Sequence, residues 1–287
     1  MDRSYVLMTD DCCDLPPEYY IEHDIPVLNV TYIFYGKAYR GTEMSYREFY
    51  DRLRQGEMPT TAQVTVNQAS AMMEKFLQRG KDILYFAFSS GLSGTYESGM
   101  VAARDLSEKY PERKIRVIDS LCASLGQGLM LHKLVKMRDA GKSMDELADW
   151  AEANKLHLAH IVTVEDLMHL HRGGRISKAS AVMGGMLGIK PMIHMNNEGK
   201  LITIGKVRGR KASLEAIVDI MAKAVGNTPN DEFFVCHSDC YEEAEYVAKL
   251  ASKRFGINDY RIHYIGPVIG SHTGPGTIAL FMMAEHR

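Results

Sequence analysis

The amino-acid sequence predicts an α/β protein of two domains, with a largely parallel sheet in the first and a mixed sheet in the second. In the first half, short runs rich in β-branched and aromatic residues alternate with segments of helical periodicity. The second half contains its own complete set of strands and helices. No low-complexity linker separates the halves, and we place the domains at residues 1–155 and 156–287.

The composition is that of a soluble globular protein. The chain has 287 residues, 46% of them hydrophobic and 24% charged, which is enough to build a full core. A formal charge of −2 gives no reason to expect nucleic acid as a partner, because phosphate binding relies on a clustered basic surface. The five cysteines are odd in number and lack C-x-x-C spacing, which favours free thiols. With no apolar stretch of signal-peptide or membrane-span length, we expect a cytoplasmic protein.

The first half supplies the elements of a parallel sheet. YVLMTD at 5–10 and VLNVTYIFY at 27–35 have the composition of strands. The segment 65–79 starts with a capping box and continues with apolar residues at helical intervals. DILYFAF at 82–88 is a continuous apolar run, typical of a central strand, and a helix follows at 95–109. The pattern then continues with a strand at 114–120, a helix at 123–140 and a capping box at 143–146.

The second half supplies a further sheet. Its expected strands are at 160–164, 190–195, 201–207, 232–237 and 260–265. Its expected helices are a segment around the Gly-Gly pair at 173–174 and longer helices at 211–225 and 241–255. Because no flexible linker joins the halves, we expect them to pack together, and clefts between domains are common ligand sites.

Three loops rich in small and hydroxyl residues follow these elements. SSGLSGT at 89–95 connects an expected strand to a helix, at the carboxyl end of the sheet where open α/β folds bind ligands. It lacks the lysine of a Walker loop and fits neither G-x-G-x-x-G nor G-x-S-x-G, so nucleotide and hydrolase interpretations lose their usual support. The other loops are PTTAQVT at 59–65 and IGPVIGSHTGPGT at 265–277, and each alone is typical of a turn.

Metal-ligand residue types occur in two places without metal-site spacing. CHSDC at 236–240 is better explained as a strand-to-helix junction with Asp239 near the cap. The second group consists of His157, His160, His169 and His171. We therefore expect no metal.

Several sequence blocks together resemble one family. In order, and at about the family's spacing, the chain contains TDDCCDLPPEYYIEHDIPVLNVTY, PTTAQVT, FSSGLSGTYESG, VIDS, LHRGGRIS, GIKP, KVRGRKA and GSHTGPGT. They resemble the DegV family of bacterial fatty-acid-binding proteins, of the FakB type, over nearly the whole chain. The resemblance implies a two-domain α/β carrier, without catalytic residues or a cofactor, that holds one long-chain fatty acid between its domains. It also implies a partner, a separate ATP-dependent fatty acid kinase that converts the bound acid to an acyl phosphate.

Two blocks depart from the family pattern. The usual D-S-T/S-A/C-D reads DDCCD at 10–14, and the usual T-S-Q-P-S reads TAQVT at 61–65. Thr61 matches the family's carboxylate-binding threonine and is retained, as is Ser93. The departures therefore concern loop shape and acyl preference more than the head-group site.

The three loops carry the groups that a buried carboxylate needs. Such a carboxylate must accept hydrogen bonds, and Thr61, Ser93 and backbone N–H groups beside Gly94 can donate them. His272 can donate one more, and its neighbour Thr273 completes the expected carboxylate-binding set. The acyl tail supplies the affinity, at about 0.8 kcal/mol per buried methylene.

Two small groups of basic residues are candidates for docking a partner. Arg172 and Arg175 flank a Gly-Gly turn, and Lys206 and Arg208 cluster with Arg210 and Lys211 after an expected strand. The resemblance favours docking of the kinase at these residues, with transient contact to an anionic membrane surface as the alternative.

Two other classes of function stay open. The first is an enzyme that acts on a small anionic substrate through Ser93 and His272. The second is a regulatory protein that senses lipid. A carrier differs from the enzyme in retaining a long-chain acid through gentle purification.

Overall fold

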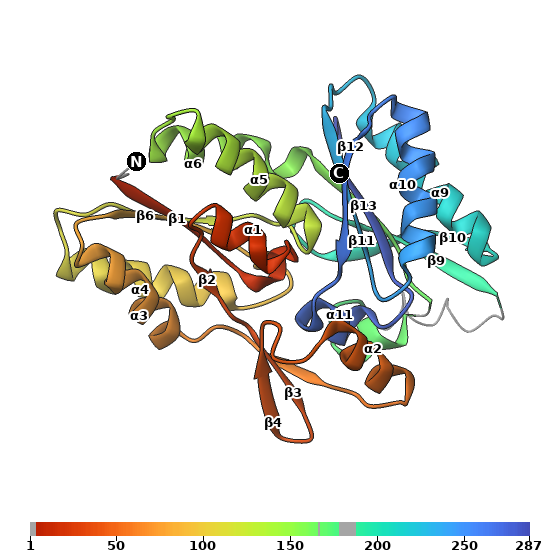
Figure 1. The fold of residues 1–287 in the computed structure, drawn as a ribbon, viewed down its shortest axis with the longest axis horizontal. Coiled ribbons are helices and arrows are strands. Elements are labelled where there is room, and N and C mark those ends of the chain that lie inside the picture. The colour runs from red at the N-terminus through yellow and green to blue at the C-terminus, as the bar shows by residue number, and fades with distance from the viewer. Residues whose placement is uncertain (1–3, 166, 178–187) are drawn as a thin grey trace.

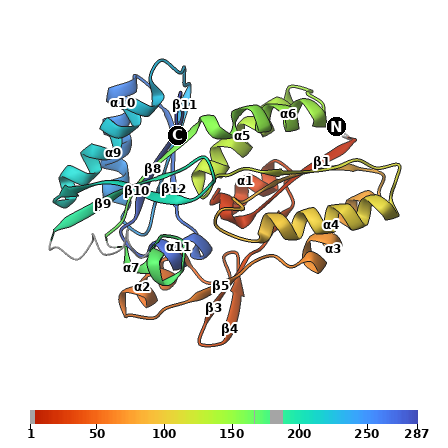
Figure 2. The same ribbon diagram turned by 180° about the vertical axis from the view of Figure 1, so that it is seen from behind.

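The structure is a computed structural model that describes residues 4–165, 167–177 and 188–287. Figure 1 shows two β-sheets side by side, with helices packed against each of them. The view from behind in Figure 2 shows the same arrangement, with helix α5 (Leu125–Asp139) where the two sheets approach each other. None of the helices in these residues has the length and apolar character needed to cross a membrane.

The first sheet is parallel, as the sequence predicts. Its strands lie in the order β2 (Val27–Leu28), β1 (Tyr5–Asp10), β6 (Asp82–Ala87) and β7 (Ile115–Asp119). Successive side chains of β6 enter two different cores, Ile83 and Tyr85 one of them, Leu84 and Phe86 the other. Both faces are therefore covered, one by α3 (Val66–Leu77) and α4 (Thr95–Lys109), the other by α5 and α6 (Met144–Asn154).

The second sheet is mixed, which also confirms the prediction. Its strands lie in the order β10 (Leu201–Arg208), β9 (Ile189–Met195), β8 (Leu158–Thr163), β13 (Ile278–Met283), β11 (Glu232–His237) and β12 (Asp259–Tyr264). The β11–β12 pair is parallel and the other neighbours are antiparallel. Helices α9 (Arg210–Val225) and α10 (Tyr241–Phe255) cover its outer face. On its inner face, Phe234 and Phe281 join the core around α5.

The prediction of one strand at 27–35 is wrong. The segment divides into β2 and β3 (Thr31–Phe34), because the N–H of Val30 donates to Oδ1 of Asp11 (2.9 Å). Strand β3 pairs with β4 (Lys37–Arg40) and β5 (Thr60–Ala62) in a small antiparallel sheet. Thr61 therefore lies on a strand, where a loop was expected.

The prediction of a loop throughout 265–277 is also wrong. Pro267–Thr273 forms helix α11, with Pro at its first position and Gly274 (φ 76°) at its end. Strand β13 begins at Ile278, after the short segment 274–277, and lies inside the second sheet, although no strand was expected there. Its run IALFMM is buried throughout, and so short an apolar run carries no periodicity that separates strand from helix. The remaining helices are α1 (Pro17–Glu22), α2 (Tyr46–Arg54), α7 (Met168–Arg172) and short 3₁₀ turns at Asp11–Cys13 and Lys155–His157.

A buried ionic cluster fixes the second sheet to α5. Glu232, at the start of β11, is 2% exposed, accepts a hydrogen bond from Lys136 (2.9 Å) and lies 3.2 Å from Nε2 of His132. The hydroxyl of Tyr19 in α1 bonds the other nitrogen of that imidazole (2.7 Å). Burial raises the pKa of Glu232, but the hydrogen bonds from His132 and Lys136 outweigh burial and hold that pKa at about 2. The junction between the sheets therefore depends on a carboxylate that stays ionised.

We expect Glu232→Gln to lower the free energy of unfolding by about 2 kcal/mol near neutral pH, because the variant leaves Lys136 without its counter-ion. The depressed pKa stabilises the fold above the ordinary value of 4.5, and this contribution is lost as the pH falls toward about 2. Denaturant unfolding of both proteins across this window measures the effect. The difference between them should shrink on acidification, and a difference that does not change with pH would contradict this role of Glu232.

Candidate functional site

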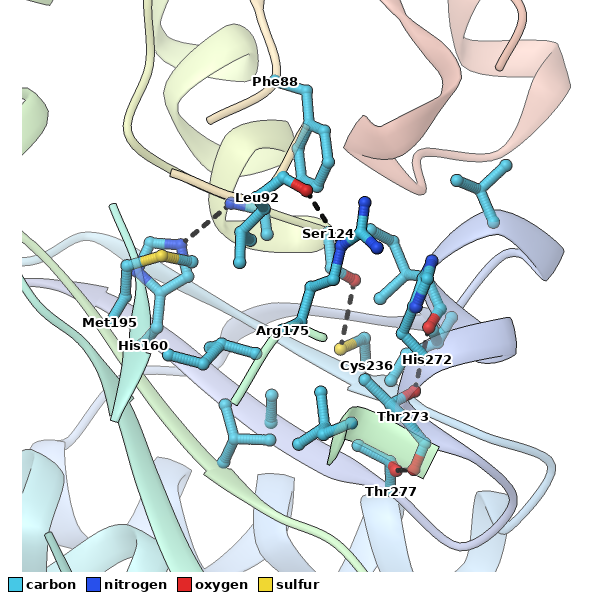
Figure 3. A pocket seen from close by; sticks show the side chains of 18 of the residues that line it. Phe88, Leu92, Ser124, His160, Arg175, Met195, Cys236, His272, Thr273 and Thr277 are labelled. Atoms are coloured by element: carbon cyan, nitrogen blue, oxygen red, sulfur yellow. Dashed lines mark hydrogen bonds between the residues drawn. The ribbon is translucent and has the colours of Figure 1, made fainter. Parts of the chain in front are cut away.

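A cavity lies between the two sheets (Figure 3). Its floor is the inner face of the second sheet, with Val162 and Ile193, and its roof is formed by the segments that follow β6 and β7, with Phe88, Leu92 and Ala123. Helix α11 closes one side. The volume open to the centre of a water molecule is about 160 Å³, and one water needs only about 10–15 Å³ on that measure. Because most of the lining is aliphatic or aromatic, the cavity suits an apolar ligand.

The side chains of Thr61 and His272 form the polar end of the cavity. Thr61 on β5 and His272 on α11 share a hydrogen bond between Oγ1 and Nε2 (2.8 Å). Ser93 lines the same cavity, and its hydroxyl pairs with that of Thr95 at the start of α4 (3.0 Å). The fold thus brings residues from three separate predicted loops to one cavity.

Gly94 and Thr273 occupy less direct positions. Gly94 precedes α4 and does not line the cavity, and its carbonyl accepts a hydrogen bond from Nε2 of Gln63 (3.1 Å). Thr273 does line the cavity, but its hydroxyl donates to the carbonyl of Ile269 within α11 (3.3 Å). In this geometry Gly94 lies outside the cavity wall, and Thr273 contributes to it.

His272 is a neutral imidazole. Burial, and to a smaller extent the charge of Arg175, lower its pKa to about 4. Its Nδ1 is buried and has no hydrogen-bond partner in the described part of the chain, and Gly173 packs against that atom. A proton on Nε2, donated to Thr61, fits this arrangement because it leaves no buried N–H unpaired. The hydroxyl proton of Thr61 is then free to be donated to a ligand.

Arg175 belongs to the cavity wall. Its Nε donates to the carbonyl of Leu92 (3.0 Å), and Nη1 donates to the carbonyl of Gly173. Burial lowers its pKa, yet a guanidinium stays charged in proteins. Among the described residues no carboxylate pairs with it, so it places an uncompensated positive charge beside His272.

The other three predicted docking residues are exposed. Arg172 ends α7, and its Nη1 lies 2.7 Å from Sδ of Met58. Lys206 and Arg208 lie on β10, the edge strand of the second sheet, with their side chains on the same exposed face. Their role in docking, and that of Arg175, stays a prediction.

Ser93 and His272 do not form a nucleophile and base pair. Ser93 bonds to Thr95 and His272 bonds to Thr61, and in the part of the chain described here no hydrogen bond links the two. Nucleophilic catalysis needs the base within hydrogen-bond reach of the serine. The arrangement therefore favours binding of a carboxylate over attack on a substrate.

No three His, Cys, Asp or Glu side chains within residues 4–165, 167–177 and 188–287 are grouped so that they could hold a metal ion. The segment 236–240 is a strand-to-helix junction, as expected, with Cys240 at the N-cap of α10. The N–H of Cys240 donates to Nδ1 of His237 (3.2 Å), and burial raises the pKa of the Cys236 thiol. These groups serve local structure.

Sequence reasoning missed much of the cavity floor. His160 and Val162 lie two residues apart on β8, and both side chains face the cavity. Ala279 and Phe281 have the same relation on β13. The alternation in HIVTV is a signal that places the first pair on one face. No such signal identified Ala279 and Phe281, because β13 was not recognised as a strand. In the sequence, His160 stands out only as a metal-ligand type.

The chain matches one family model over nearly its whole length. That model, described as "Uncharacterised protein, DegV family", matches residues 4–285. A DegV domain-containing protein of Clostridium perfringens is 41% identical over 286 residues, which are 99% of this chain and 98% of that protein.

Two solved structures share the fold. A fatty acid (stearic acid)-binding protein from Eubacterium ventriosum has 28% identity and a TM-score of 0.88, with 98% of each chain covered. A DegV family protein from Thermus thermophilus, described for its fatty acid binding, has 26% identity and a TM-score of 0.88, with 98% of this chain and 100% of that chain covered. These likenesses confirm the predicted α/β fold and the resemblance.

We expect the imidazole of His272 to titrate near pH 4 in the ligand-free protein, because burial and the charge of Arg175 disfavour its protonation. Histidine NMR signals followed from neutral to acid pH measure this. Arg175→Gln should raise the pKa, whereas Arg172→Gln, which alters an exposed cation in the same segment, should leave it unchanged. A midpoint at the ordinary value of 6.5 in the wild-type protein would show that His272 is not buried as described.

Proposed function

The chain belongs to the DegV family, and we propose that it binds one long-chain fatty acid in the cavity and presents the carboxylate to a separate ATP-dependent fatty acid kinase. Proteins of this family bind fatty acids, as the Eubacterium ventriosum and Thermus thermophilus structures record. In the proposal, residues 1–155 and 156–287 are the two domains that enclose the acid. The protein is a cytoplasmic carrier that needs no cofactor.

One observation carries this proposal. The cavity between the sheets is mostly apolar, and polar lining side chains such as Ser124, His160 and Thr277 already form hydrogen bonds within the protein. The donors and the positive charge of Thr61, Ser93, His272 and Arg175 lie at one end. A long hydrocarbon with one anionic head has the complementary pattern. A small anionic substrate would leave most of the cavity lining without a partner.

The tail supplies the affinity. Burying about 15 methylenes at about 0.8 kcal/mol each gives an upper figure of about 12 kcal/mol, which the cost of ordering the complex reduces. The cavity wall needs only to be apolar and closely packed for this purpose. Contacts with the head group then determine the orientation of the acid in the cavity.

The head group is held by neutral donors and one nearby cation. The Nε2 proton of His272 is donated to Thr61, so the Thr61 hydroxyl can donate its own proton to the carboxylate. Ser93 is the second hydroxyl donor. Arg175 offsets the negative charge without a bidentate clamp, because Nε and Nη1 are already engaged with backbone carbonyls. A carboxylate held in this way keeps an oxygen available for reaction.

The head group is also accessible from outside. A second hollow adjoins the cavity and shares Thr61, Arg175 and His272 with it, and its other walls include Met58 and Arg172. In the proposed reaction a carboxylate oxygen bonds to the γ-phosphorus of ATP held by the kinase, and ADP leaves. The second hollow is the side from which that phosphorus would approach.

We expect protein freed of lipid to bind one equivalent of hexadecanoic acid, which native mass spectrometry or calorimetry can measure. Ser93→Ala and Thr61→Val should each weaken binding about tenfold, because each leaves a carboxylate oxygen short of one donor.

Matched controls lie next to both positions. Ser90→Ala alters the same loop as Ser93, and Thr60→Val alters the same strand as Thr61, but neither residue lines the cavity. Both controls should bind the acid as the wild type does. No binding by the wild-type protein, or equal losses in control and test variants, would refute the proposed site.

We expect the double variant Lys206→Ala and Arg208→Ala to form acyl phosphate about tenfold more slowly with a fatty acid kinase and ATP, while binding hexadecanoic acid normally. Exposed charges on an edge strand act on association with the partner. Lys253→Ala with Arg254→Ala, at exposed positions of α10, is the control.

Unchanged acyl-phosphate formation in the Lys206→Ala and Arg208→Ala variant would rule out a docking role for these two residues. A wild-type protein that binds the acid but supports no acyl-phosphate formation would point to a lipid sensor.

A further inference from the structure

The cavity is closed by two aromatic rings at the end opposite His272. His160 of β8 and Phe281 of β13 face each other in the ladder and contact edge to face, with ring centroids 5.3 Å apart. Both side chains are buried and line the cavity. Figure 3 shows His160 beside Met195, on the far side of the cavity from His272.

The floor runs along β13 from the polar end to these rings. Thr277, Ala279 and Phe281 lie on one face of the chain, and the hydroxyl of Thr277 donates to the carbonyl of Thr273 at the end of α11 (3.0 Å). Phe281 lies about 13 Å further along the strand. The next residue on this face, Met283, belongs to the core around α5 and does not line the cavity. The floor therefore ends at Phe281.

The middle of the floor is lined by smaller side chains. Ala279 pairs with Val162 on one neighbouring strand and with Cys236 on the other, and all three line the cavity. Their side chains are shorter than the rings of Phe281 and His160 that follow. A hydrocarbon lying over Ala279 would therefore meet the rings at its end.

The rings cannot move back from the cavity. Gly126, in the first turn of α5, lies directly behind them, and a Cβ on this residue would come closer than 3.0 Å to both rings. Both imidazole nitrogens of His160 are also engaged: Nδ1 donates to the carbonyl of Leu158, and Nε2 accepts from the N–H of Ala123 (3.3 Å each). This pattern needs a neutral ring, which burial favours by lowering its pKa. The end wall is therefore uncharged and fixed.

We infer that the His160–Phe281 pair is the stop against which the methyl end of the acyl chain rests, so that it sets the longest fatty acid the protein accepts. The inference rests on the proposed function. An acid too short to reach the rings leaves empty apolar space, and one too long must displace fixed rings or draw its carboxylate away from Thr61. Affinity should rise about fourfold per methylene up to the stop and fall beyond it.

A series of saturated acids from decanoic to eicosanoic tests this. Dissociation constants are measured for each acid with lipid-free wild-type protein and variants, and the chain length at which affinity stops rising is the readout. Phe281→Ala should move that length upward by about two carbons, because the tail can fill the space of the lost ring. Gly126→Ala should move it downward, because the new methyl group pushes the rings into the cavity.

Phe233→Ala is the matched control. Phe233 is equally buried, but it lies in the core on the outer face of the second sheet and does not line the cavity. It should lose stability without moving the length limit. If Gly126→Ala does not fold, Phe281→Ala and the control still decide the outcome. If the chain length at which affinity stops rising is unchanged in Phe281→Ala, or changes equally in Phe233→Ala, the inference that the two rings stop the acyl chain is overturned. A wild-type protein that binds no acid in the series overturns the proposed function itself.

Discussion

The hydrogen bond between His272 and Thr61 joins α11 to β5 across 211 residues of sequence, and the polar end of the cavity depends on it. Burial keeps the imidazole uncharged, and its unpaired Nδ1 fixes which nitrogen carries the proton. The bond therefore orients the hydroxyl of Thr61 toward the cavity. Without it, an anionic head group would meet a threonine whose proton could point elsewhere and a buried imidazole with no partner for either nitrogen.

The cavity separates two physical tasks. In the proposed complex, apolar side chains of the second sheet and of the segments after β6 and β7 would remove a hydrocarbon from water, an effect that is non-directional and tolerant of detail. The polar end would give the bound acid its direction, because it offers hydroxyl donors and a positive charge to a buried carboxylate. Arg175 contributes charge from a guanidinium whose Nε and Nη1 are bound to the carbonyls of Leu92 and Gly173, so it acts as a fixed positive potential near the head group.

The sequence was informative where a pattern was long or a motif had a local mechanism. Both capping boxes form as predicted, at Thr65 and at Ser143, and the apolar run of β6 is the central strand that it resembles. Clustered hydroxyl and glycine residues drew attention to the donor loops, but each loop alone is typical of a turn, and the resemblance to the family singled out their donor residues. The floor was not found, because β13 is a short uniform run whose environment is decided by strands distant in sequence. From the sequence, Arg175 is expected to be a surface cation. Its hydrogen bonds to the carbonyls of Leu92 and Gly173, which only the fold shows, place it in the cavity wall.

A crystal structure of the protein with bound hexadecanoic acid tests the account most directly. We expect the carboxylate to lie within hydrogen-bond distance of the hydroxyls of Thr61 and Ser93, with the chain over Ala279 and its methyl end directed toward His160 and Phe281. A chain bound in the opposite direction, or an acid bound elsewhere while this cavity holds none, would contradict it.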